Sequence, residues 1–169
     1  MQLGRGFRLK AGYMKAGLND IAQSPRERVL LLAARIGERA VADWCAELLE
    51  GVVKYDDPRS PPITWLGGRH AAVQMGRGGF VARTQDYWPR VWAARGLLYA
   101  WDPGASGAVV AALRDRAWRV REMAAKVVRH RGIARAEPIL SALLDDPVER
   151  VRVAAEAALA EFARRDGSA

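Results

Sequence analysis

The chain has 169 residues, about one domain, with 50% hydrophobic and 27% charged residues. This composition is typical of globular proteins and excludes wholesale disorder. The longest apolar runs, such as 29–34, last six residues, whereas a transmembrane helix needs about 20. The sequence therefore predicts no membrane span.

The formal net charge of +8 is unevenly distributed along the chain. Residues 1–60 carry +2, residues 61–135 carry +9 and residues 136–169 carry −3. Arginine supplies most of the cations, which can reflect a GC-rich genome, but such a bias does not explain why the excess lies in the middle. The central excess favours an anionic partner and says nothing about the fold.

The sequence predicts neither a metal site nor a cofactor. Cys45 is the single cysteine and lies on an apolar stripe, so we expect a buried thiol and no internal disulfide. The two histidines, His70 and His130, lack the spacing of metal ligands. Residues 1–19 are glycine-rich and basic without an apolar signal segment, which predicts a flexible leader on a cytoplasmic protein. Residues 20–169 then form one domain.

A repeat of 31 residues organises the second half of the chain. Three segments align in register at this spacing: 88–97, 119–128 and 150–159. A second apolar segment recurs between them, at 108–115 and 138–145, and looser copies of both lie at 29–36 and 40–49. Apolar residues at i, i+3, i+4 and i+7 predict two helices in each period and an all-α fold.

The pattern x-V-R-x-x-A-A-x-x-L, preceded by an Asp and by a P-x-L-x-x-L-L helix, resembles the HEAT repeat in its short bacterial form. The resemblance covers 87–164 well and 24–50 moderately. It implies an α-solenoid of about four to five helix pairs, one of them degenerate. In this family, an Asp and an Arg at these positions form a ladder between successive repeats. The resemblance therefore assigns a structural role to four residues: Asp115, Arg121, Asp146 and Arg152. Thr84 replaces the Asp of the first copy, which leaves Arg90 either free or paired with Asp86.

Residues 51–86 depart from the repeat. The prolines within 59–62 cannot continue a helix, so we expect an irregular insertion at 51–68. Helical composition returns at 69–83, where several glycines weaken or break the helix. The Gly-Arg-Gly-Gly-Phe stretch at 76–80 also resembles a nucleic-acid-binding element, although a helix break explains it better.

The strongest functional candidate is a surface, because no nucleophile, base and orienting group come together in the sequence. On the helix at 87–99, aromatic and cationic residues follow i, i+4, i+7 and i+11, and three of the four equivalent positions in the next repeat are Arg, Lys and His. The resemblance implies that the second helix of each repeat lines the concave face. The predicted binding surface is Trp88, Trp92, Arg95, Tyr99, Arg119, Lys126, Arg129 and His130. Alternatively, Trp88 and Trp92 pack against the 51–86 segment as core.

Three functions stay open at this point, since a fold alone does not decide function. The first is a non-catalytic adaptor that binds a protein partner through the concave face. The second is nucleic-acid binding through the dense basic cluster at 114–135. The third is an enzyme similar to the helical-repeat alkylpurine DNA glycosylases, whose acidic and aromatic grouping Asp86, Tyr87 and Trp88 resemble.

Overall fold

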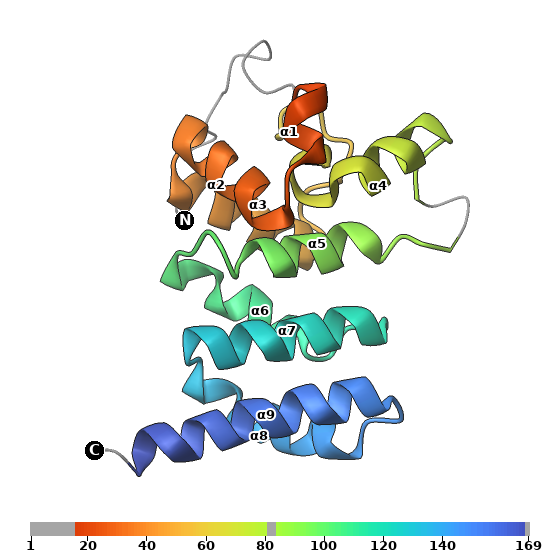
Figure 1. Cartoon of the computed structure of the whole chain (residues 1–169). Coiled ribbons are helices and arrows are strands. Elements are labelled where there is room, and N and C mark those ends of the chain that lie inside the picture. The colour runs from red at the N-terminus through yellow and green to blue at the C-terminus, as the bar shows by residue number, and fades with distance from the viewer. Residues whose placement is uncertain (1–15, 81–83, 168–169) are drawn as a thin grey trace, which may run out of the picture.

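The computed structural model describes residues 16–80 and 84–167 (Figure 1). Within these residues 71% are helical and none lies in a β-strand, which confirms the all-α prediction. Most of the predicted leader at 1–19 lies outside the described residues. A short helix, α1 (Leu18–Ala22), begins inside its last part.

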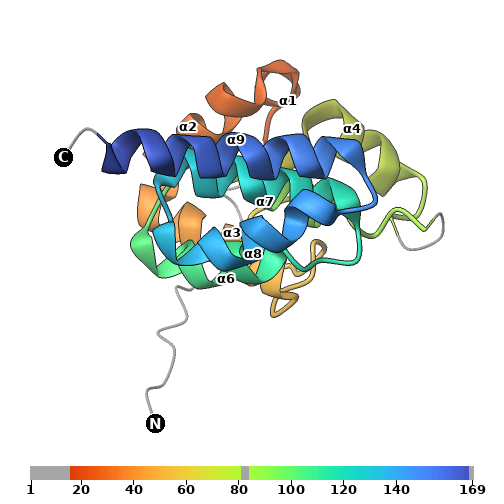
Figure 2. The same ribbon diagram turned by 90° about the horizontal axis from the view of Figure 1, so that it is seen from below.

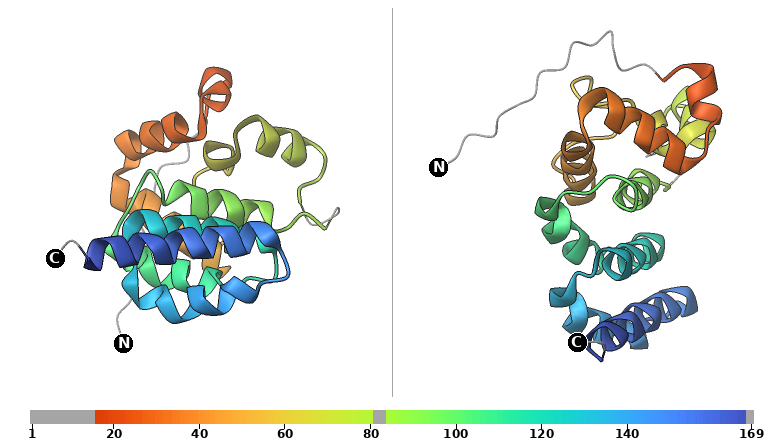
Figure 3. Two further views of the ribbon diagram at one scale, coloured as in Figure 1. Left: turned by 60° about the horizontal axis from the view of Figure 1, so that its bottom comes forward. Right: turned by 60° about the vertical axis from the view of Figure 1, so that its left-hand side comes forward.

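The helices of the repeats lie in two layers, and within each layer successive helices are stacked along the same direction (Figures 1, 2 and 3). One layer holds the second helices of the repeats: α5 (Trp88–Gly96), α7 (Trp118–Arg131) and α9 (Glu149–Asp166). The other holds the first helices: α3 (Glu38–Glu50), α6 (Ser106–Ala112) and α8 (Glu137–Ala142). Short 3-10 turns flank the first helices: Pro103–Ala105, Ala134–Ala136 and Leu143–Asp145. Because α5, α7 and α9 run side by side in the same direction, their C-terminal ends lie together, at the left of Figure 1.

The irregular segment divides a helix pair instead of following one. Helix α3 packs against α5, and the chain between them leaves the array to form α4 (Thr64–Gly76). Helix α4 packs against α1, against α2 (Pro25–Ile36) and against α5. It begins at Thr64, inside the insertion predicted at 51–68. Pro61 and Pro62 lie before its first turn, so their missing N–H groups remove no hydrogen bond from the helix. It ends at Gly76, the first of the glycines that were predicted to weaken or break this helix.

Helix α4 bends at Gly68, whose φ of 58° and ψ of −140° are not helical. The carbonyl oxygens of Trp65 and Leu66, just before the bend, accept hydrogen bonds from Arg28 of α2, each at 3.1 Å. Arg28 also donates to the Gln23 carbonyl and is only 4% exposed. A Cβ on Gly68 would lie 2.7 Å from the Arg28 guanidinium, so this position needs glycine for both space and conformation.

Helix α2 begins with a capping box, and the buried thiol predicted at Cys45 is confirmed. Ser24 caps α2 by accepting a hydrogen bond from the Glu27 N–H at 3.3 Å, and the Glu27 carboxylate accepts one from the Ser24 N–H at 2.9 Å. Cys45 is fully buried on α3, and this burial raises the pKa of its thiol to about 12. The thiol is therefore neutral at physiological pH and is not an activated nucleophile.

A ladder of charged side chains links the second helices. Arg121 donates from Nε and Nη2 to the carboxylate of Asp146, one repeat later, at 2.8 and 3.0 Å. Arg90 does the same to Asp115 at 2.7 and 3.2 Å, so the guanidinium of the first copy is not free. Arg121 also reaches the carbonyl oxygen of Asp115, and Arg152 reaches that of Asp146, at 2.9 and 2.7 Å. Each repeat is thus tied to the next by paired, directional bonds.

We expect Asp146→Asn to lower the free energy of unfolding by about 1–3 kcal/mol at neutral pH. Burial alone would raise the pKa of Asp146, but hydrogen bonds from Arg121 and from the Val148 N–H hold it below the usual value. A carboxylate with a lowered folded-state pKa stabilises above its unfolded pKa, near 3.8, and loses that contribution as pH falls further. In urea titrations, the difference between wild type and variant should therefore shrink below pH 4. The exposed neighbour offers a control, Asp145→Asn; an equal effect there would contradict the ladder.

Candidate functional site

Trp92 lies in the core and not on the predicted surface. Its side chain is 3% exposed, stacks on Trp88 at 5.8 Å between ring centroids, and meets the rings of Phe80 and His70 at 5.4 and 5.3 Å. A Cβ on Gly67 of α4 would lie 2.4 Å from the indole. Helix α4 therefore covers this part of α5, as the alternative interpretation of the tryptophans predicted.

Arg95 is also drawn into this contact. It is half-buried, and its Nη2 donates to the carbonyl oxygen of Leu66 at 2.9 Å. Burial lowers the pKa of Arg95, and the neighbouring charge of Arg28 lowers it further. Arg95 thus helps to hold the bend of α4. Trp92 and Arg95, two residues of the predicted binding surface, therefore pack against α4.

Aromatic rings and arginines alternate across the N-terminal ends of α5, α7 and α9. The guanidinium of Arg119 lies 4.3 Å from the ring centroid of Trp118 and 5.6 Å from those of Tyr87 and Trp88. Arg150, one period later, lies 5.6 Å from the ring of Trp118. All three rings are half-buried. We call these five residues the aromatic–arginine cluster; cation–π contacts of this kind are worth about 0.5–1 kcal/mol at exposed sites.

Glu122 neutralises part of the positive charge beside the cluster. This residue is 7% exposed, and its carboxylate lies 2.8 Å from Lys126 Nζ and 3.2 Å from Arg150 Nη2. Lys126, which was predicted to bind, and Arg150 therefore share the carboxylate of Glu122. The side chains of Lys126 and Arg150 stay 46% and 68% exposed, so both remain available to a partner.

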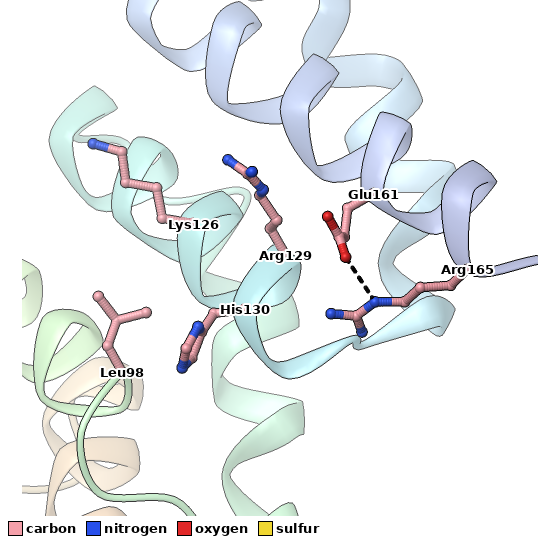
Figure 4. Close-up of a pocket in the computed structure, with 6 residues that line it drawn as sticks. All are labelled: Leu98, Lys126, Arg129, His130, Glu161 and Arg165. Atoms are coloured by element: carbon pink, nitrogen blue, oxygen red, sulfur yellow. Dashed lines mark hydrogen bonds and ion pairs between the residues drawn. The ribbon is translucent and has the colours of Figure 1, made fainter. Parts of the chain in front are cut away.

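Two adjoining pockets lie at the C-terminal ends of the same helices. One, of about 360 Å³, is lined by Leu98, Lys126, Arg129, His130, Glu161 and Arg165 (Figure 4). The other, of about 430 Å³, is lined by Arg26, Leu30, Glu38, Leu98, Tyr99, His130 and Arg131. Because Leu98 and His130 line both, we treat the two pockets as one feature, the C-terminal groove.

A family model for HEAT repeats matches residues 80–160, a stretch that runs from just before α5 into α9. Residues 80–160 are therefore HEAT repeats, and the all-α fold is that of a HEAT-like helical repeat protein. No curated protein matches the chain, and no solved structure matches it. HEAT repeats generally mediate protein–protein interaction. Among the helices of the described ranges, none is long and apolar enough to cross a membrane.

The basic run at 114–135 is divided among different parts of this HEAT array, because neighbours in a helical sequence point in different directions. Arg114 and Arg116 lie in the connection between α6 and α7, and Arg121 belongs to the ladder. Arg135 lies in the 3-10 turn before α8. The predicted residues that reach the C-terminal groove are Tyr99, Lys126, Arg129 and His130.

The acidic residue that resembled a glycosylase feature is held by arginines of the HEAT array. The carboxylate of Asp86 pairs with Arg116 and lies 4.0 Å from Arg90 Nη1. Residues 16–80 and 84–167 contain no group of three or more potential metal ligands.

The groove also contains residues that sequence analysis missed, from elements far apart in the chain: Arg26, Leu30, Glu38, Leu98, Glu161 and Arg165. One signal for part of this set was present in the sequence. The last turns of α7 and α9 carry consecutive basic residues, 129–131 and 164–165. In a HEAT array these ends lie side by side, so their cations gather at one edge.

Proposed function

We propose that this protein is a non-catalytic adaptor that binds a partner protein through the face formed by α5, α7 and α9. The aromatic–arginine cluster carries the proposal, because Trp88, Arg119 and Arg150 occupy equivalent positions in three successive repeats. Tryptophan, tyrosine and arginine are the residue types that most often dominate the energetics of protein–protein interfaces. The general role of HEAT repeats in protein–protein interaction supports the same function.

The half-buried state of the cluster suits binding better than packing alone. Its rings are already oriented by their neighbours, so a partner that covers them loses little side-chain entropy of the adaptor. Arg150 is the most exposed residue of the cluster, with 68% of its side chain exposed, and its guanidinium retains donors beyond those used by Glu122. A partner that completes the burial of Trp88 and Trp118 would gain apolar area at the centre of the interface.

Photo-crosslinking tests which layer the partner contacts. A crosslinking amino acid at Met123, half-buried on α7 between the cluster and Lys126, should give a discrete product in the native cells of the protein. The same group at Arg114, exposed in the connection between α6 and α7, should not. In the Met123 background, Arg119→Ala with Arg150→Ala should reduce the product about tenfold or more, since truncating interface anchors costs about 2 kcal/mol each. An equal yield from Arg114, or a product that the double variant leaves unchanged, would contradict the proposal.

Nucleic-acid binding is the second candidate, because half-exposed rings beside arginines can stack on bases. It is less well supported than protein binding. Glu122 neutralises Lys126 and Arg150, and Glu161 neutralises Arg165, so the face lacks the continuous positive track that a phosphate backbone follows. A duplex DNA arm in the experiment below compares the two candidates directly.

A further inference from the structure

We propose that the C-terminal groove binds an acidic peptide segment that also carries an apolar side chain. The carboxylates of the segment would lie at Lys126 and Arg129, and its apolar side chain at Leu98. This inference rests on the proposed function, because it names the chemistry of the partner protein that the array binds. It concerns a part of the surface separate from the aromatic–arginine cluster, at the opposite ends of the same helices.

The charge of the groove is unbalanced. Five cationic side chains line its two pockets against two carboxylates. Both carboxylates already have partners: Glu161 accepts from Arg165 at 3.0 Å, and Glu38 accepts from the Trp101 N–H at 3.1 Å. Within the described part of the chain, neither Arg26 nor Arg129 has a carboxylate at ion-pair distance. Lys126 is paired with Glu122, but its side chain stays 46% exposed. The groove therefore offers the unpaired Arg26 and Arg129, together with the accessible Lys126, to an incoming anion.

Helix ends explain only part of this arrangement. Basic residues in a last turn complement the partial negative charge of a helix C-terminus, which accounts for one or two cations on each helix. That effect does not explain the apolar residues between the cations. Leu30 is 41% exposed, Leu98 is half-buried and lines both pockets, and Tyr99 is half-buried and lines the second. Cations around exposed apolar residues match a segment that combines both chemistries.

The walls of the groove favour a peptide over nucleic acid. Glu161 stands between Arg129 and Arg165 in the first pocket, as Figure 4 shows, and Glu38 lines the second. A phosphate backbone carries charge at every nucleotide and would meet these carboxylates. A peptide can place its acidic side chains at Lys126 and Arg129 and an apolar side chain at Leu98.

The probe is a fluorescein-labelled 12-residue peptide with four glutamates and two leucines in a Gly-Ser background. Fluorescence anisotropy would measure its binding to the full chain at two salt concentrations. We expect binding that weakens as salt rises, because exposed charges are screened. Lys126→Gln with Arg129→Gln should bind about tenfold more weakly, since two charged contacts are lost. Glutamine keeps the helix propensity of both positions. The matched control, Arg114→Gln with Arg135→Gln, should bind like the wild type.

Three further arms complete the experiment. A peptide with glutamine in place of glutamate should not bind, and Leu30→Ser should weaken binding of the acidic peptide a few fold. A 20-base-pair DNA duplex should bind more weakly than the peptide at the same salt concentration. The inference is overturned if the wild type does not bind the acidic peptide, if the groove variant binds as tightly as the control, or if DNA binds more tightly through the same two cations.

Failure of this inference is distinguishable from failure of the proposed function. If the Met123 crosslink forms and depends on Arg119 and Arg150, while the acidic peptide does not bind, the adaptor function stands and the groove assignment is wrong. If the peptide binds through Lys126 and Arg129 but no crosslink forms from α7, the groove is a site and the partner does not use the cluster.

Discussion

Trp92→Ala is expected to lower the free energy of unfolding by about 3–5 kcal/mol, the range for a buried tryptophan or phenylalanine cut to alanine. The indole is 3% exposed and contacts α4 through Gly67, so its removal would leave a cavity between α4 and α5. Neither side of that cavity can close easily, because the bend of α4 is fixed by hydrogen bonds from Arg28 and Arg95. Such a loss is a large fraction of the stability of an ordinary domain, about 5–15 kcal/mol.

The neighbouring tryptophan provides the control for this prediction. Trp88→Ala removes a half-buried ring that stacks on Trp92 and should cost less than half as much. Urea unfolding followed by far-ultraviolet circular dichroism measures both variants without relying on tryptophan fluorescence. In the crosslinking experiment the order should reverse, with Trp88→Ala the more harmful. If Trp92→Ala were the milder of the two in unfolding, α4 would not cover α5 in solution.

Arg28→Met is expected to destabilise the protein by about 3 kcal/mol or more. Methionine fills a similar volume, but the carbonyl oxygens of Gln23, Trp65 and Leu66 would each lose a hydrogen bond from Arg28, and a bond from a charged group contributes about 1.5–3 kcal/mol. Leu66 would keep its bond from Arg95. Loss of the charge returns part of this, because burial disfavours the cation and lowers the pKa of Arg28. The loss of three hydrogen bonds outweighs that gain. The exposed neighbour is the matched control: Arg26→Met should change stability by about 0.5 kcal/mol or less.

A double-mutant cycle with Gly68→Ala tests the cause of this effect. Alanine at residue 68 forces a strained φ and places a Cβ 2.7 Å from the Arg28 guanidinium. With methionine at residue 28 the second of these penalties is relieved, so the two substitutions should be less than additive. Chemical denaturation of the four proteins gives the coupling energy. Strict additivity would mean that Arg28 and the bend of α4 do not act together.

The repeat spacing predicted the regular half of this fold because its contacts are local. A period of 31 residues with two apolar stripes already implies paired helices, and the positions of Asp146 and Arg121 follow from it. The partner of Arg90 was harder to predict. Its closest carboxylate belongs to Asp115, 25 residues downstream, while the predicted partner Asp86 lies 4.0 Å from the guanidinium and accepts a hydrogen bond with its backbone oxygen. A ladder that links repeats is visible only once the register between them is known.

The surface was predictable only in part, and α4 is the reason. Helical spacing places Trp92 and Arg95 on the same stripe as Trp88, but it does not reveal what covers them. Helix α4 covers them, and its position depends on hydrogen bonds from Arg28 to Trp65 and Leu66, which lie 37 and 38 residues further along the chain. The C-terminal groove was missed for the same reason, since its walls come from α2, α3, α7, α9 and the turn after α5.

The insertion of α4 within the α3–α5 pair makes the two ends of the array unequal as building units. Helix pairs at the C-terminal end contact their neighbours in sequence, so an array of this kind can lengthen or shorten there by whole repeats. At the other end, α2 and α4 pack against α5, and α2 and α3 supply part of the groove. Evolution can therefore add or remove repeats after α9 with little rearrangement, whereas the N-terminal half must be inherited as one piece.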